Sequence, residues 1–241
     1  MGINAEIRSV IERRDSCGQI IVLKDSFQSV SKTKGMTNGG IVYDGIVDLE
    51  KFNGLVFLLK EATKAGTKKF GNGWSLVEQA AIEAGNQNSQ VPKKWETLCY
   101  WTEAYKDSTK TYKDAAKCGG NLAEIAIVNI KKTAGEGTSE NAPMNTIMKN
   151  AEYKQILRDE ITAIKKTGKQ LLVICGGTFD WAKKLYDVAR GEVKLMDCGA
   201  EYFQRDGIIF LNFVHPSVRC GKEVTYAYAQ AVFAERKRKN L

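Results

Sequence analysis

Four continuous apolar runs, separated by amphipathic stretches, constrain the fold of this chain most strongly. The runs cover residues 55–60, 123–130, 170–175 and 207–214. Uninterrupted apolar segments of this length are typical of strands that are buried on both faces, as in a parallel sheet. A shorter apolar segment at residues 19–23 is a further candidate strand.

Amphipathic stretches alternate with these runs, and their spacing predicts helices. The expected helices are residues 75–84, 94–106, 152–166, 178–190 and 223–239. Alternation of buried strands and helices is the pattern of an α/β protein whose helices cover both faces of a sheet. We therefore expect a three-layer α/β/α sandwich with a central four-stranded parallel sheet.

The length and composition favour one folded domain. The chain has 241 residues, of which 43% are hydrophobic and 27% charged, which is unlike a disordered protein. We expect residues 1–50 to form an N-terminal extension packed on or preceding a core of residues 51–241. No apolar run is long enough for a membrane span, and the first residues lack the apolar region of a secretory signal. These features predict a cytoplasmic, monomeric protein without a membrane partner.

The charge balance points to a polyanionic partner. Lys and Arg number 36 against 28 Asp and Glu, a formal net charge of +8. Neutralising phosphates releases counterions, and this dominates non-specific binding to nucleic acid. Part of the surplus lies in the basic run 236–239, for which a solvated helix end and a nucleic-acid arm are both open interpretations.

The cysteine pattern predicts reduced thiols. The six cysteines form no C-x-x-C pair, and the single histidine is far from most of them in the sequence. This spacing is unlike a zinc site or a disulfide framework. We expect no cofactor, no metal and no iron–sulfur cluster.

Polar residues follow the four expected strands at their carboxyl ends, where α/β sheets bind ligands. Glu61 follows the first strand, Asn129 ends the second, and His215 follows the fourth. Each has an ordinary structural alternative as a helix cap, a turn residue or a buried donor, but their joint placement indicates a site. The Gly176-Gly177 pair after the third strand does not fit G-x-G-x-x-G and predicts a tight strand-to-helix turn.

This ordered set resembles the uracil-DNA glycosylase superfamily. That family has a first motif such as G-E-A-P-G after strand one, a base-reading Asn at the end of strand two, and H-P-S after strand four. Here residues 60–63 read K-E-A-T, residues 128–132 read V-N-I-K-K, and residues 215–217 read H-P-S. The resemblance covers about residues 55–235.

The resemblance implies a role for each matching residue in removing a base from DNA. Glu61 would orient or activate the attacking water, and Asn129 would hydrogen-bond the edge of the flipped base. His215 would stabilise the charge that develops on the departing base. Ser217 would hold a backbone phosphate, and Arg219 would act as the wedge that fills the gap in the duplex.

Further residues are implied around the base and the DNA. Trp74 would stack on the base, with Phe70 as the alternative stacking residue. The remaining candidates are the base-pocket residues Ala62 and Lys64 and the DNA-binding residues Lys131 and Lys132.

Three departures from the family pattern matter, and the second of them bears on the substrate. Thr63 and Lys64 replace the Pro and Gly of the first motif, and Lys64 stands near the place of the tyrosine that excludes a 5-methyl group in many uracil enzymes. Thr133 occupies the place of a cluster cysteine. An amide can pair with uracil or with cytosine, so the choice of base stays open.

We therefore expect a DNA glycosylase that flips out a pyrimidine and hydrolyses its N-glycosidic bond to leave an abasic site. The base is uracil or a modified pyrimidine, such as the 5-substituted or glucosylated cytosine of phage DNA; removing the latter would be an anti-phage defence. The alternative is a non-catalytic reader of modified or abasic DNA. A Schiff-base lyase and an α/β hydrolase rank lower, the latter because no G-x-S-x-G elbow occurs.

Overall fold

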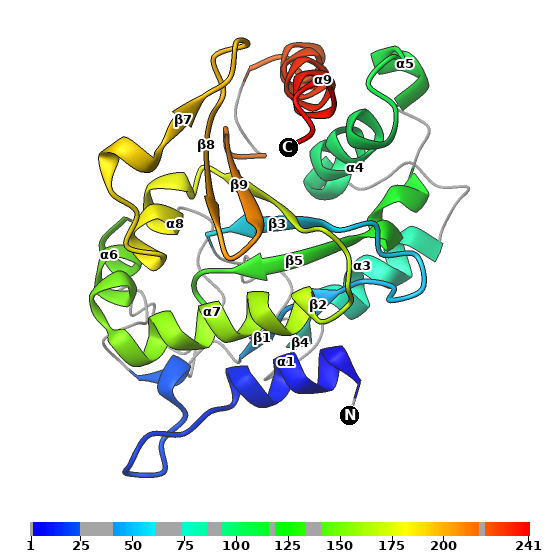
Figure 1. Ribbon diagram of the computed structural model, residues 1–241. Helices are drawn as coiled ribbons and strands as arrows, with labels where there is room; N and C mark the ends of the chain where they lie inside the picture. Colours follow the sequence, from blue (N-terminus) through cyan, green and yellow to red (C-terminus); the bar gives the residue numbers. More distant parts are fainter. Residues whose placement is uncertain are drawn as a thin grey trace.

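A mixed seven-stranded sheet forms the centre of the protein (Figure 1). The computed structural model describes residues 2–24, 41–60, 74–85, 93–115, 119–133, 141–216 and 220–241. In the sheet the strand order is β2-β5-β3-β6-β9-β8-β7. The four central strands are mutually parallel: β5 (Ile125–Asn129), β3 (Leu55–Leu59), β6 (Leu172–Gly176) and β9 (Ile208–Phe213).

Three antiparallel edge strands correct the expectation of a four-stranded parallel sheet. The strand β2 (Gly45–Ile46) pairs with β5, and β8 (Glu201–Arg205) with β7 (Lys194–Leu195) extends the sheet beyond β9. These strands are short or have exposed residues. They therefore lack the continuous apolar run from which the central strands were predicted. A separate two-stranded sheet joins β1 (Val42–Tyr43) to β4 (Trp74–Ser75).

Helices pack on both faces of the sheet, as Figure 1 shows. Along β3, Leu55 and Phe57 join one apolar cluster, whereas Val56 and Leu58 join the other. Leu55 and Phe57 pack with helices α3 (Leu76–Gly85), α4 (Lys93–Lys106), α5 (Tyr112–Ala115) and α9 (Lys222–Arg238). Val56 and Leu58 pack with α1 (Ile3–Ile11), α6 (Asn141–Lys149), α7 (Ala151–Lys165) and α8 (Phe179–Leu185).

Two expected elements differ from those in the structure. Residues 19–23 do not form a strand: Ile20 bridges Arg14, and Ile21–Leu23 is the 3₁₀ helix η1. The helix α8 ends at Leu185, short of residue 190, and Asp187 adopts a left-handed φ of 52° just beyond its end. Two further 3₁₀ helices are η3 (Gly119–Glu124) and η4 (Arg190–Glu192).

The N-terminal segment contributes directly to the sheet and its core. Ile7 and Ile11 of α1 are buried in the cluster that also contains α7. The Asn4 side chain bonds both backbone groups of Ile46: Nδ2 donates to the carbonyl at 2.8 Å, and Oδ1 accepts from the N–H at 3.0 Å. This contact ties α1 to strand β2, which lies within residues 1–50.

The basic run 236–239 lies at the C-terminal end of α9. Arg238 and Lys239 both pair with Asp197, at 2.7 and 2.9 Å. Cations are favoured at a helix C-terminus, where the carbonyls carry partial negative charge. The position of the run therefore has a structural explanation that requires no nucleic acid.

Candidate functional site

The carboxyl ends of the parallel strands bring three sequence-distant polar residues to one edge. Lys60 follows β3, Asn129 ends β5, and His215 lies two residues after β9. Backbone pairing continues past the strands, because the Lys131 N–H donates to the Lys60 carbonyl at 2.9 Å. Of the residues implied by the resemblance, Asn129 and His215 are thus described, and both lie at this edge.

A close backbone approach holds the His215 loop against the end of β6. Gly177 has a φ of +69°, and its N–H donates to the Phe213 carbonyl at 2.8 Å. A Cβ on Gly177 would lie 3.1 Å from His215 Cβ, and one on Gly176 would lie 3.0 Å from Pro216 Cδ. The glycine pair therefore forms the expected tight turn and also makes room for residues 215–216.

The environment of His215 favours the neutral imidazole. The pKa of His215 lies below its ordinary value, because burial penalises the charged ring and the Lys60 ammonium repels a proton on it. The Lys60 Nζ also lies 5.1 Å from the centre of the Trp181 ring. From the other face of the sheet, Thr97 Oγ1 donates to the Pro216 carbonyl at 2.9 Å. The loop is thus supported from α4, and Trp181 of α8 lies beside Lys60.

Asn129 is buried, and Asp44 binds it twice. Asp44 lies between β1 and β2; its Oδ2 accepts from the Asn129 backbone N–H at 2.5 Å, and its Oδ1 accepts from Asn129 Nδ2 at 2.8 Å. Asn129 is 1% exposed and Asp44 3% exposed. This contact bridges 85 residues of sequence.

Asp44 belongs to a fully buried charge cluster. The Lys132 Nζ lies 2.6 Å from Asp44 Oδ2 and 2.6 Å from Glu160 Oε2, and all three side chains are 0% exposed. Burial raises the pKa of Glu160, and the nearby Asp44 charge raises it further, against the opposing effect of Lys132. For Lys132, burial would lower the pKa, but the two carboxylates outweigh it and the pKa is raised. Burial thus favours the protonated form of Glu160, and the two acidic neighbours favour the charged form of Lys132.

This arrangement corrects the expectation that Lys131 and Lys132 contact DNA. The ammonium of Lys132 is enclosed by two carboxylates, and the Lys131 side chain is buried as well, at 1% exposure. A phosphate cannot reach either side chain in this structure. The basic sequence after β5 is therefore part of the core.

The other expected site residues fall outside the described structure. They are Glu61, Ala62, Lys64, Phe70, Ser217 and Arg219. For Trp74 the backbone belongs to β4, but its side chain is likewise outside the description.

Three residues at the site escaped the sequence analysis. Asp44 contacts Asn129, Trp181 lies under Lys60, and Thr97 binds the loop after β9. None of them stands in a motif or at the end of a parallel strand, so no local signal in the sequence marks them.

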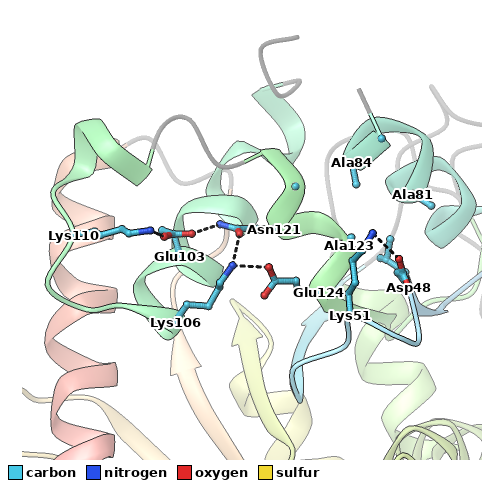
Figure 2. Close-up of a pocket in the computed structure, with 13 residues that line it drawn as sticks. Asp48, Lys51, Ala81, Ala84, Glu103, Lys106, Lys110, Asn121, Ala123 and Glu124 are labelled. Atoms are coloured by element: carbon cyan, nitrogen blue, oxygen red, sulfur yellow. Dashed lines mark hydrogen bonds and ion pairs between the residues drawn. The ribbon is translucent and has the colours of Figure 1, made fainter. Parts of the chain in front are cut away.

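A hollow, shown in Figure 2, lies at the opposite end of the strands from this site. It has a volume of about 460 Å³, and it is lined by Ala123 and Glu124, which directly precede β5. Its three lysines are paired with carboxylates: Lys51 with Asp48, Lys106 with Glu124, and Lys110 with Glu103. We assign it no role, because its charges are neutralised within the wall.

Two further properties concern the described residues only. No cluster of three or more His, Cys, Asp or Glu there is placed to hold a metal ion, and the five described cysteines are free thiols. No described helix is both long and apolar enough to cross a membrane. In comparisons with known proteins, no family model and no curated protein matches the chain. A functional assignment must therefore rest on the residues of the site.

Proposed function

We propose that the protein is a DNA glycosylase that flips a pyrimidine base out of DNA and hydrolyses its N-glycosidic bond. The observation that carries this proposal is that Lys60, Asn129 and His215 lie at the same edge of the parallel sheet. Glu61 directly follows Lys60 in the sequence. Base excision needs a carboxylate, an amide and an imidazole; Asn129 and His215 provide the amide and the imidazole at this edge.

Base recognition falls to Asn129. A base inside a duplex is inaccessible, so the enzyme must extrude it, at a cost of a few kcal/mol, and read its hydrogen-bonding edge. A carboxamide offers one acceptor and two donor hydrogens, which suits the edge of a pyrimidine. The net charge of +8 supports binding to the DNA backbone.

Departure of the base falls to His215. In the reaction a water oxygen bonds to the sugar carbon, while the electron pair of the broken C–N bond leaves with the base. A neutral imidazole N–H can donate to the 2-oxygen of the departing pyrimidine, where negative charge develops. The lowered pKa of His215 supports this neutral form. Glu61 would orient the water and accept its proton.

The substrate base is uracil or a modified pyrimidine, including the 5-substituted or glucosylated cytosine of phage DNA. Lys64 in place of a family tyrosine supports the second choice, because no aromatic ring there excludes a 5-substituent.

The proposal is tested with single- and double-stranded oligonucleotides that carry one uracil or one 5-hydroxymethylcytosine. Abasic sites formed by the enzyme are detected by alkaline strand cleavage. We expect cleavage at the marked base with wild type and its loss in Glu61→Gln. Tight binding without abasic sites on any substrate would favour the non-catalytic reader.

A further inference from the structure

The contact between Asp44 and Asn129 has a consequence for base recognition. The Asp44 carboxylate accepts from the backbone N–H of Asn129 at 2.5 Å and from Nδ2 at 2.8 Å. An ionised carboxylate can only accept hydrogen bonds. Only the Nδ2 side of the Asn129 amide can therefore face Asp44, since Oδ1 there would place two acceptors in contact.

Lys132 fixes which oxygen of Asp44 faces the Asn129 side chain. Its ammonium donates to Asp44 Oδ2 at 2.6 Å in a site closed to solvent. Oδ2 thus accepts from Lys132 and from the Asn129 backbone N–H, and Oδ1 accepts from Asn129 Nδ2. These buried contacts hold the Asn129 amide in one orientation.

A fixed amide distinguishes the two kinds of pyrimidine edge. Uracil presents an N–H at N3 beside an acceptor oxygen, whereas cytosine presents an acceptor at N3 beside an amino group. The donor and the acceptor thus occupy opposite positions in the two bases. One orientation of the Asn129 amide is complementary to uracil, and the flipped orientation is complementary to cytosine. A site that hydrogen-bonds its ligand rejects a mismatched analogue strongly, because buried polar groups are left unpaired.

We propose that Asp44 is a positioning residue that fixes the base specificity of Asn129, so that the site accepts only one of the two pyrimidine edge types. This inference rests on the proposed function, because it takes Asn129 to read the base. It concerns binding, however, and it holds for a glycosylase and for a non-cutting reader alike.

We expect the isosteric variant Asp44→Asn to flip the side-chain amide of Asn129. Asp44 Oδ2 accepts from two donors, the Asn129 N–H and Lys132 Nζ, so an asparagine must keep its oxygen there. Its NH₂ group then takes the place of Oδ1 and faces the Asn129 side chain. The Asn129 amide must then flip so that its Oδ1 accepts from this NH₂ group. The flip exchanges the donor and the acceptor that Asn129 presents to a base.

Glu160→Gln is the matched control. It replaces the other acidic side chain that contacts Lys132 and leaves Asp44 in place. The described contacts place Asp44, not Glu160, on Asn129. A loss of stability alone would therefore affect both variants, whereas a change of base preference is expected from Asp44→Asn only.

The test measures binding to oligonucleotides that carry uracil or cytosine on a 2′-fluorinated sugar, whose glycosidic bond resists cleavage. The measured quantity is the ratio of the dissociation constants for the uracil and the cytosine oligonucleotide. We expect wild type to bind one of the two more tightly, and we expect Asp44→Asn to shift this ratio toward the other base by at least about tenfold. Glu160→Gln should keep the wild-type ratio. No preference in wild type, or an unchanged ratio in Asp44→Asn, would overturn the inference.

If Asp44→Asn does not fold, NMR of the Asn129 side-chain amide decides instead. The inference requires Nδ2 protons that exchange slowly with solvent and differ in chemical shift from exposed amides; rapid exchange would refute it. Release of a base from cleavable DNA is scored separately, so failure of the glycosylase proposal remains distinguishable.

Discussion

Gly177 and His215 approach each other closely at a point that favours glycine. A Cβ on Gly177 would lie 3.1 Å from His215 Cβ, and the φ of Gly177 is +69°. The turn after β6 therefore sets how closely the loop after β9 can approach. The position of the imidazole depends on a residue from a neighbouring strand, not on its own loop alone.

Gly177→Ala is expected to disturb both stability and the site. An L-residue at this φ costs about 1–2 kcal/mol, and the new methyl group pushes His215 away. Gly168→Ala is the control, because Gly168 has a φ of +74° and nothing within 4 Å of its Cβ position. We expect similar losses in unfolding free energy from backbone strain, but a drop in excision rate of about tenfold or more only in Gly177→Ala. Equal rates in the two variants would contradict the contact's role.

His215→Ala should lower the rate of base excision on the order of a hundredfold, because one donor to the departing base is lost. Val214→Ala, at an exposed position next to it, serves as the control. Single-turnover kinetics and thermal unfolding of both variants check this. A His215→Ala enzyme that folds and excises at the wild-type rate would remove His215 from the mechanism.

The imidazole of His215 should titrate below pH 6.5, and Lys60 should contribute to that shift. Because the chain has a single histidine, NMR follows its ring without assignment. Burial and the Lys60 charge both lower its pKa, so Lys60→Gln should raise the pKa toward the ordinary value. Lys183→Gln is the control, since Lys183 also lies over an aromatic ring, at 5.3 Å from the centre of Phe179. A pKa that Lys60→Gln leaves unchanged would refute the coupling.

Glu160 should make the protein less stable as pH rises. Its pKa is raised to about 8 by burial and by Asp44, whereas the unfolded value is near 4.5. The native state therefore keeps a proton that the unfolded chain loses, and the free energy of unfolding falls between about pH 5 and 8. Glu160→Gln should remove most of this decline, which amounts to a few kcal/mol at roughly 1.4 kcal/mol per pH unit. Urea unfolding at both pH values measures it; parallel pH profiles would disprove the assignment.

The central strands and most helices could be predicted because burial on two faces leaves a continuous apolar run. The edge strands could not, since β7 is two exposed residues and β8 has only two consecutive buried residues, Tyr202 and Phe203. Residues 19–23 have the same apolar character as a strand, yet they close a 3₁₀ turn. Local hydrophobicity marks burial there but not backbone conformation.

The candidate site was predictable where it depends on strand ends and hidden where it depends on tertiary contacts. Asn129 and His215 lie at the same edge because parallel strands end there together. Asp44 comes from 85 residues earlier, between β1 and β2, and nothing near it in the sequence indicates its partner. Lys132 was mispredicted for the same reason. A lysine in a basic run is expected at the surface, and only the structure shows that Lys132 is buried against Asp44 and Glu160.

Release of a free base tests the central claim most directly. Wild type and Glu61→Gln would be incubated with uracil-containing DNA, unmodified DNA, and phage DNA bearing hydroxymethylated or glucosylated cytosine, and the supernatants analysed by mass spectrometry. The account predicts that wild type releases one pyrimidine, which identifies the substrate, and that Glu61→Gln releases none. Tight DNA binding with no base released from any substrate would contradict a glycosylase.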